Sequence, residues 1–557
     1  MAYTATLLGL SRGGVFRGAA LLALGLPMPR IAAAADEPAK PAKSANAEIV
    51  HLINEKLAEK WQANKLTPSN RCSDYEFIRR VSLDIIGRVA TPKELIQFFK
   101  DAPEVRRSLL IDRLLKSEEY AKNFANLWTV LLMTRSGATD PARSVYHEQM
   151  HDWLEKRFAE NMAWKEIIVQ LLTATGKTTK ENGAVNYILA HLGEPVPPGN
   201  QEGHFNMVPV TARTTRLFLG IQTQCTQCHD HPFNPGKQLN FWGINAFFRQ
   251  VDRKGDKPMR GREPPVLELV DDPSLDPSGT VFYETRRGVV WSTKPYFFLD
   301  KVRLPGEGNR REKLAELIAS SEYFPKAYVN RIWQHFFGRG FTNPVDDFGE
   351  HNEPSHPELL NALAADFGHY GYDTKQLIRW ICNSNAYSLS SVANRTNASS
   401  EFEPFFSRML LKAMTPEQLF ESLLAATRAE MFESKETREE LRKKWLTDLT
   451  TNFGDDEGNE VTFNGTVVQA LMMMNGGYLN KAIASKGHLA NLVKKESPNA
   501  ILDYLYKAAL NRPPTSTESS RILKIYRTAP VKHADGLSFW QDVFWALLNS
   551  NEFILNH

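Results

Sequence analysis

The sequence predicts a mainly α-helical protein with two helical domains joined by a short insertion that contains a β-hairpin. Three observations predict this class. Apolar residues repeat at helical spacing from residue 48, helical patterns resume at Arg310 and continue to the C-terminus, and a β-rich stretch with many Gly and Pro residues separates the two halves. A chain of 557 residues, of which 42% are hydrophobic, is typical of a globular protein too long for one hydrophobic core.

The first helices follow from apolar spacing and from one helix-start signal. Apolar residues between Ile49 and Leu57 recur every three to four positions, and residues 75–86 and 92–99 repeat this pattern. Thr91 followed by Pro92 predicts a helix start, because a hydroxyl caps the first turn and proline is tolerated at the first helical position. We expect the first domain to span residues 48–251.

The connection between the halves covers residues 252–300. Residues 280–283 (TVFY) and 289–292 (VVWS) are β-rich, and a short polar stretch of residues 284–288 separates them. This arrangement predicts a hairpin inside the connection. The second helical domain is then expected at residues 301–557.

The N-terminus has the pattern of a secretory signal. Arg12 and Arg17 form a positive flank, residues 18–26 (GAALLALGL) form a short apolar core, and small residues up to Ala35 supply a cleavage site. The signal peptide is therefore expected at residues 1–35, and the Pro-, Ala- and Lys-rich residues 36–47 predict a disordered linker. A secreted or periplasmic location follows, with no transmembrane segment after cleavage.

The charge balance argues against a nucleic-acid partner. Cleavage after Ala35 removes three arginines and no acidic residue, which cancels the formal charge of +3. Binding to nucleic acid usually requires a basic face, and a neutral mature chain gives no sign of one.

A short pattern recurs along the chain. Leu114–Tyr120 (LLKSEEY) resembles Leu547–Phe553 (LLNSNEF), and each predicts a helix end, a serine cap and a new helix with an acid in its first turn. Two interpretations are open: duplicated helical units, or a common helix–serine–helix corner used more than once.

The strongest chemical motif is Cys225-Thr-Gln-Cys228-His229-Asp230-His231. Two thiols three positions apart followed by histidine form the attachment signature of c-type haem. In this interpretation Cys225 and Cys228 hold the haem covalently, and His229 is the proximal iron ligand. His204, Met207 and His231 are candidates for the distal ligand, His231 being a poor one because it lies only two residues from the proximal ligand.

Two other interpretations of the motif stay open. Cys225, Cys228 and either His229 or His231 could bind zinc or iron with a ligand from elsewhere, since zinc accepts mixed cysteine and histidine ligands. The two cysteines could instead form a small disulfide loop. The remaining cysteines, Cys72 and Cys382, are isolated in the sequence and are predicted to be buried thiols.

The second half carries a further candidate site at Asp346, Asp347, His351 and His356. These residues lie in a stretch rich in Gly, Pro and Asn, where loops predominate. Two carboxylates and two imidazoles could bind a divalent metal or act as acid and base. The alternative is turn chemistry, in which the aspartates and Ser355 cap helices.

Both halves resemble known domains of unknown function. The first half resembles the planctomycete secreted cytochrome-like domain, and the second half resembles the planctomycete-specific domain that commonly follows it. The motifs behind the resemblance are residues 77–88 (FIRRVSLDIIGR), 172–176 (LTATG), 218–222 (FLGIQ) and 225–233 in the first half, and residues 329–340 (VNRIWQHFFGRG), 346–349 (DDFG), 354–360 (PSHPELL), 414–419 (MTPEQL) and 545–553 in the second. Larger relatives often add a separate cytochrome c domain, whereas the one C-x-x-C-H motif of this sequence is expected inside the first domain itself.

The function expected from the sequence is a secreted or periplasmic redox protein that binds one haem c for electron transfer with a periplasmic redox partner. The alternatives are a metal-dependent extracellular enzyme or binding protein, acting on polysaccharide, and a structural or interaction protein whose cysteines form a disulfide.

Overall fold

The first described element of the computed structural model is helix α1, Ala42–Ala63. The structure describes residues 42–135, 144–197, 203–231, 236–256, 264–305, 308–428, 434–451, 488–528 and 536–557. The expected signal peptide lies outside these residues, as does most of the expected linker. Residues 42–47 are helical, so the linker prediction is wrong for them; three of these residues are alanines, which favour helix.

Most of the described chain is helical, as the sequence predicts. In the first half, α1 is followed by helices α2 (Asp74–Ile86), α3 (Pro92–Lys100), α4 (Arg106–Leu115), α5 (Glu118–Met133), α7 (Ser144–Ala159), α8 (Trp164–Thr173), α9 (Val185–Ala190), α10 (Val208–Leu219), the 3₁₀ helix η1 (Gln224–Gln227) and α11 (Gln238–Asn245). The predicted start at Thr91 is confirmed, because its side chain and that of Glu94 form a reciprocal capping box at α3.

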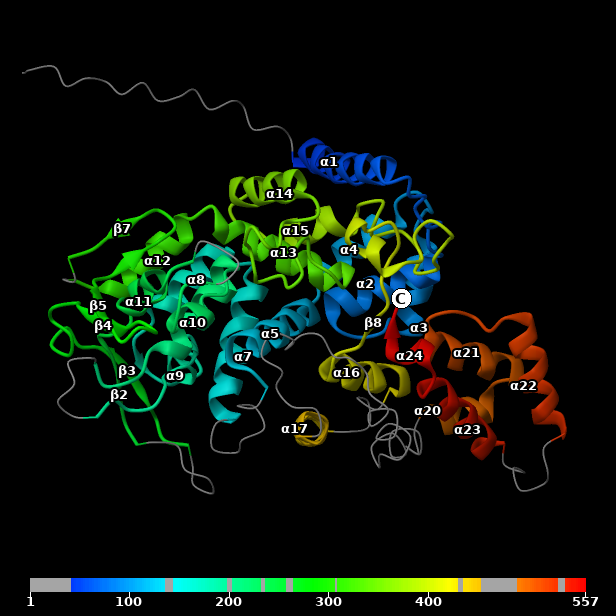
Figure 1. The fold of residues 1–557 in the computed structure, drawn as a ribbon. Helices are drawn as coiled ribbons and strands as arrows, with labels where there is room; N and C mark the ends of the chain where they lie inside the picture. Colours follow the sequence, from blue (N-terminus) through cyan, green and yellow to red (C-terminus); the bar gives the residue numbers. More distant parts are fainter. Residues whose placement is uncertain are drawn as a thin grey trace, which may run out of the picture. The chain divides into compact units, whose positions relative to one another are not determined.

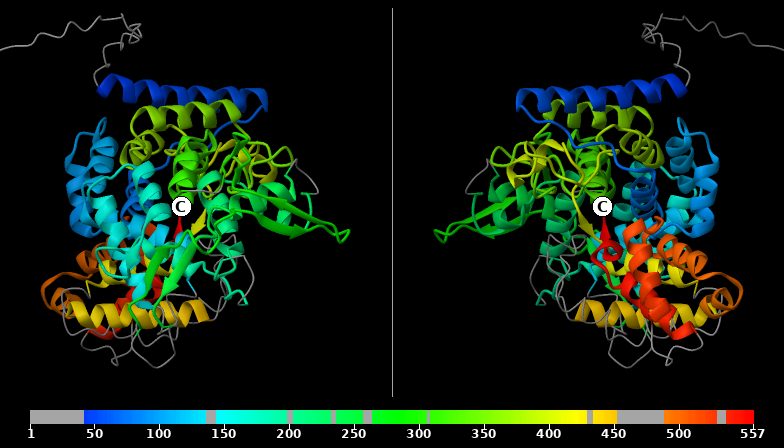
Figure 2. Two further views of the ribbon diagram at one scale, coloured as in Figure 1. Left: turned by 90° about the vertical axis from the view of Figure 1, so that its left-hand side faces the viewer. Right: turned by 90° about the vertical axis from the view of Figure 1, so that its right-hand side faces the viewer.

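The second half is helical as well. Its elements are α12 (Arg310–Ser320), α13 (Tyr323–Phe337), α14 (Pro357–His369), α15 (Thr374–Cys382), η2 (Ser400–Phe405), α16 (Pro416–Thr427), α17 (Lys435–Thr451), α20 (His488–Lys495), α21 (Pro498–Leu510), α22 (Ser516–Thr528), α23 (Leu537–Leu548) and α24 (Asn551–Ile554). Figure 2 shows α14 alongside α1, where Lys56 Nζ lies 3.0 Å from a carboxylate oxygen of Glu358. None of the described helices is long and apolar enough to cross a membrane.

The strands form small antiparallel sheets. The predicted hairpin is present: β4 (Val281–Glu284) pairs with β5 (Val290–Thr293), with Tyr283 opposite Trp291. A three-stranded sheet has the order β1 (Gly176–Lys177), β3 (Glu268–Asp271) and β2 (Val251–Lys254), and the remaining pairs are β6 (Tyr296–Phe297) with β7 (Val302–Arg303) and β8 (Lys412–Ala413) with β9 (Leu555–Asn556). Because β1 belongs to the first helical half, the connection packs onto that half through β3.

The hydrophobic cores divide the chain at a different place from the expected domain boundary. One cluster of buried side chains runs from Ile49 to Met409 and includes residues from both expected domains. A second cluster runs from Met414 to Phe553 and adds only Leu83 and Val89 from the first half. The described residues from Asn46 to His557 form one unit. The two helical halves therefore share a core, and the break between cores falls near residue 410.

A buried polar cluster around Asp84 ties α2 to distant segments. Asp84 Oδ1 lies 2.7 Å from Lys412 Nζ and accepts a hydrogen bond from Asn556, and its Oδ2 accepts one from the hydroxyl of Tyr387. Lys412 Nζ also donates to the carbonyls of His335 (2.7 Å) and Phe336 (2.9 Å) at the end of α13. The C-terminal strand thus lies beside β8 and α2 (Figure 1).

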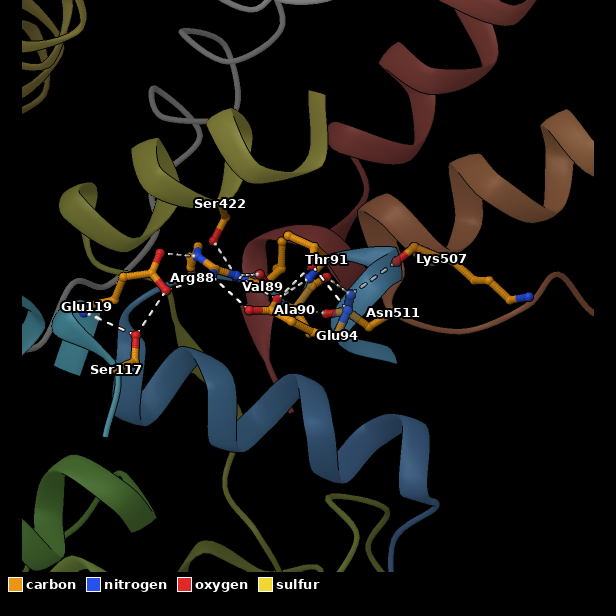
Figure 3. A network of polar contacts seen from close by, with 10 residues as sticks. All are labelled: Arg88, Val89, Ala90, Thr91, Glu94, Ser117, Glu119, Ser422, Lys507 and Asn511. Atoms are coloured by element: carbon orange, nitrogen blue, oxygen red, sulfur yellow. Dashed lines mark hydrogen bonds and ion pairs between the residues drawn. The ribbon is translucent and has the colours of Figure 1, made fainter. Parts of the chain in front are cut away.

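A second polar cluster, centred on Arg88, joins the loop after α2 to the C-terminal core. Figure 3 shows the guanidinium between the carboxylates of Glu94 and Glu119, at 2.6–2.9 Å from their oxygens. The adjoining backbone is held by Asn511, whose Oδ1 accepts from the amide of Ala90 at 3.2 Å. Arg88 thus connects three segments of the first half at the surface of the second core.

The same arrangement recurs at Arg512 near the C-terminus. Its guanidinium lies between Glu518 and Glu552 and, like Arg88, also donates to the carbonyl of the next residue. The predicted serine caps are confirmed at both copies of the recurring pattern, Ser117 for α5 and Ser550 for α24. The two copies thus share both an arginine cluster and a serine cap. This favours duplicated helical units over a common helix–serine–helix corner used more than once.

Candidate functional site

Helix α10 leads directly into the cysteine motif, and a glycine at its end sets the direction of the chain. Gly220 has φ +66°, and a Cβ added there would lie 2.6 Å from the ring of Phe348. The Gly220 carbonyl accepts a hydrogen bond from the Phe348 amide at 2.7 Å. A glycine is required here because the backbone is left-handed and an aromatic ring touches it. The motif is therefore anchored to the segment of the second half that contains Asp346 and Asp347.

The two cysteines of the motif lie on one short turn. Cys225 is within η1 and Cys228 follows it directly; both are exposed and neither forms a disulfide. The other two cysteines are buried, as predicted, and burial raises the pKa of the Cys72 and Cys382 thiols. Only the motif thiols among the four are placed to react at the surface.

Neighbouring polar contacts hold the turn. The carbonyl of Gln227 accepts hydrogen bonds from Gln238 Nε2 and Trp242 Nε1, both at 3.1 Å. Asp230 accepts from the amide of Gln238 at 3.1 Å and lies 3.0 Å from Lys237 Nζ. We refer to residues 225–231 as the cysteine turn.

The side chain of His229 is half-buried, and one of its ring nitrogens faces the backbone. Its Nδ1 lies 2.6 Å from the carbonyl oxygen of Asp230. A carbonyl can only accept, so the hydrogen belongs on Nδ1 and the lone pair on Nε2. Metal-bound histidines use this arrangement, because a hydrogen bond from the second nitrogen fixes the tautomer and the ring orientation.

His231 of the cysteine turn lies close to His351, which belongs to the candidate site predicted in the second half. The rings of His231 and His351 have centroids 5.5 Å apart, and His351 Nε2 lies 2.9 Å from Asp347 Oδ2. Burial and the nearby His351 lower the pKa of His231. Sequence spacing did not indicate that these two sets of residues meet.

Asp346 forms ion pairs with two arginines, whereas the adjacent Asp347 contacts His351. Its Oδ2 is 3.2 Å from Arg216 Nε and 3.4 Å from Arg331 Nη2, and its Oδ1 accepts from Gln222 at 3.3 Å. Arg216 and Gln222 lie just before the cysteine turn and were not singled out from the sequence. Arg216 lies in the last turn of α10, and Gln222 ends the 218–222 motif. These two positions are the sequence signals that could have identified them as site residues.

His356 is buried away from the other candidates. It is 1% exposed, its Nδ1 lies 2.9 Å from Ser355 Oγ, and the rings of Phe341, Phe405 and Phe406 surround it. Burial lowers its pKa to about 4, with a smaller effect from Lys60. The four predicted residues therefore separate into an Asp347–His351 pair, an arginine-paired Asp346 and a core histidine.

The other distal-ligand candidates have protein partners. Met207 is buried in the first core, and His204 Nδ1 lies 3.0 Å from Asp252. Residues 232–235, which include the two prolines after the motif, lie outside the described residues.

A different group with metal-ligand chemistry lies on α7. His151, Asp152 and Glu155 offer ligand atoms within 4.8 Å of one another. Lys180 Nζ lies 3.5 Å from Asp152, which reduces the negative charge available to a cation. Partly exposed acidic groups of this kind are common on helix surfaces, and this one has no second feature that indicates a ligand.

Comparison with known proteins places two domains on the chain. Residues 52–253 match PSCyt2, described as a protein of unknown function (DUF1549), and residues 310–460 match PSD1, described as a protein of unknown function (DUF1553). No curated protein and no solved structure matches the chain. The cysteine turn lies in the first match, and Asp347 and His351 lie in the second. The chain belongs to the proteins that carry these two domains of unknown function, in this order.

Proposed function

We propose that this protein is a secreted or periplasmic redox protein that binds one haem c at Cys225, Cys228 and His229. The observation that carries the proposal is the cysteine turn itself. It presents two exposed thiols three positions apart that form no disulfide, followed at once by a half-buried imidazole with Nε2 as its acceptor nitrogen. These are the residue types and the order that haem attachment requires.

The residues of the turn have distinct roles in this proposal. Cys225 and Cys228 anchor the cofactor through thioether bonds, His229 binds the iron through Nε2, and the Asp230 carbonyl holds the imidazole in the tautomer that permits it. When bound, haem supplies a one-electron redox centre. Hydrogen bonds to Gln227 and Asp230 limit movement of the turn, so the ligand set is organised before the cofactor arrives.

The location and the partner follow from the same proposal. Covalent haem attachment takes place outside the bacterial cytoplasm, and residues 1–35 have the pattern of an export signal. The exposed position of the turn leaves it accessible to a redox partner in the periplasm.

The test is an absorption spectrum of the protein exported from a host that attaches c-type haem. We expect a Soret band, and sharp α and β bands on reduction with dithionite, that stay with the protein after acid–acetone extraction. Cys225→Ser and Cys228→Ser should each weaken covalent attachment, and His229→Gln should alter the spectrum. His369→Gln is the control, since His369 lies on α14 and belongs to none of the candidate ligand sets. A colourless wild-type protein, from a host that matures a control cytochrome, would refute the proposal.

A second candidate is a metal-dependent extracellular enzyme or binding protein, acting on polysaccharide, with zinc or iron at the same turn. The observation that favours it is the approach of His231 to His351, which Asp347 orients. Cysteine thiolates and imidazoles from this region form a ligand set that zinc accepts. Elemental analysis tests it: a colourless protein with one zinc or iron per chain, lost on His351→Gln and His231→Gln, supports the metal. Absence of metal from the wild-type protein contradicts it.

A further inference from the structure

A cavity of about 820 Å³ lies beside the cysteine turn, with Cys225 in its lining. Its other walls come from α10, from the end of α9 and the loop that follows, from α7 and from β2. Cavities of this size are typical of sites for small organic ligands. Neither the proposed haem ligation nor the metal alternative assigns a role to most of these residues.

Helix α10 forms one wall because side chains three and four positions apart share a face. Ala212, Arg213 and Arg216 all line the cavity at this spacing. Arg213 is only 7% exposed, although guanidinium groups are costly to remove from water. The wall therefore combines a small residue that leaves space with two cations.

A third arginine comes from the sheet. Arg253 on β2 lines the cavity and stacks on the ring of Phe205, with 5.1 Å between its guanidinium carbon and the ring centre. Among the described lining residues, Glu194 is the one carboxylate set against these three arginines. Asp346, which lies in the second half and does not line the cavity, pairs with Arg216.

The remaining lining includes apolar surface. Met133, Leu189, Phe205 and Leu267 contribute to the walls. Guanidinium groups favour carboxylate and sulfate partners, with which they form paired hydrogen bonds. We propose that this cavity binds an amphipathic organic anion, with its acidic group at Arg253 and its apolar part against these side chains.

This proposal goes beyond the proposed function and does not depend on it. The same acidic chemistry could come from two sources, a free organic acid or the propionate groups of a haem attached at Cys225. Testing the protein both without and with haem distinguishes them, because attached haem that uses the arginines would block a free acid.

The probe is 1-anilinonaphthalene-8-sulfonate, an amphipathic sulfonate that fluoresces when it leaves water. We would titrate it into the full mature chain prepared without haem. We expect saturable binding that Arg253→Gln weakens at least tenfold. Arg303→Gln is the matched control, because Arg303 also stacks on an aromatic ring, Tyr296, but lies outside the cavity lining. Its affinity should equal that of the wild type.

Ala212→Phe supplies a second test that removes no charge. It fills the cavity from the α10 wall and should abolish saturable binding, with the folded state checked by circular dichroism. Wild-type affinity in both Arg253→Gln and Ala212→Phe would overturn the proposal, because the probe would then bind elsewhere. In haem-loaded protein, retained binding identifies a free organic acid as the ligand, and lost binding identifies the haem propionates as the anion that the arginines hold.

Discussion

The Asp84 cluster and the cysteine turn both contain several titratable side chains. Those around Asp84 are buried and paired with one another, whereas the thiols of the cysteine turn are exposed. Asp84 is 1% exposed, and its two carboxylate oxygens contact Lys412, Asn556 and Tyr387. The cysteine turn leaves its two thiols exposed and the imidazole of His229 half-buried. A buried ionised group must be paired by the protein, whereas an exposed nucleophile or ligand keeps its lone pairs for another molecule.

The difference teaches that a cluster of titratable residues indicates a functional site only when its ligating atoms remain available. By this criterion we infer that the Asp84 and Arg88 clusters stabilise the fold, and we propose the cysteine turn as the place for a cofactor. The four predictions that follow test this contrast, from the largest expected effect to the smallest.

The largest effect is expected from Asp84→Ala. Removing the carboxylate leaves Lys412 buried without its counter-charge, which should lower the free energy of unfolding by about 3–5 kcal/mol. Urea denaturation measures the change. Asp112→Ala is the control, since Asp112 pairs with Arg379 at a half-exposed site and should cost about 1 kcal/mol or less.

If Asp84→Ala does not fold, Lys412→Met introduced together with Asp84→Asn removes both charges and should recover much of the stability. Equal effects of Asp84→Ala and Asp112→Ala would contradict a structural role for the Asp84 cluster.

The second prediction concerns pH and His356. Its pKa is about 4 in the folded protein, against the ordinary value of 6.5. Between these values the unfolded chain binds a proton that the folded chain does not, so stability falls as the pH decreases from about 6.5 to about 4. The maximum loss from this one group is about 3 kcal/mol.

Denaturation at several pH values measures this loss, and His356→Gln should flatten the curve over the same range. His335 and His557 also have lowered pKa values and add to the wild-type slope, so the difference between variant and wild type isolates His356. An identical slope in the variant would show that His356 is not the buried neutral group described above.

The third prediction compares the two arginine clusters. Arg88→Met should destabilise the protein by about 2–3 kcal/mol and Arg512→Met by about 1 kcal/mol, values between those for buried and exposed ion pairs. The order follows from exposure, since the Arg88 side chain is 13% exposed and that of Arg512 is 25% exposed. Thermal or urea unfolding measures both, and a larger loss for Arg512→Met would reverse the expected order.

The smallest effect is expected at His231. Its pKa is lowered by burial and by the neighbouring His351, so His351→Gln should raise it modestly. Asp347→Asn should lower it, because the aspartate favours the protonated ring. NMR titration of the His231 ring measures the shifts, and His369→Gln serves as a control at a distant helix end. An unchanged pKa in both variants at the turn would contradict the proximity of His231 and His351.

Local features were predictable from the sequence because they depend on neighbouring residues. The capped helix start at Thr91, the serine caps at Ser117 and Ser550, and the hairpin of β4 and β5 all follow from short-range patterns. The burial of Cys72 and Cys382 was predicted because each is isolated from the other cysteines in the sequence.

Long-range features were not predictable in the same way. No local pattern indicates that Asp84 meets Lys412, and so the shared core of the two halves was missed. Sequence spacing placed His356 with His351, but a neighbour only a few positions away can face the core instead of the loop. The approach of His231 to His351 joins segments distant in the chain, as does the nearby contact between Gly220 and Phe348, and no local pattern indicates either.

The central claim is that the cysteine turn carries covalent haem, and the intact mass of the exported protein tests it most directly. Protein from a host that matures c-type cytochromes should be heavier than the processed chain by the mass of one haem. The added mass should map to the peptide that contains Cys225 and Cys228, and both single serine variants should reduce it. An unmodified mass, with a control cytochrome fully matured in the same cells, would contradict the account.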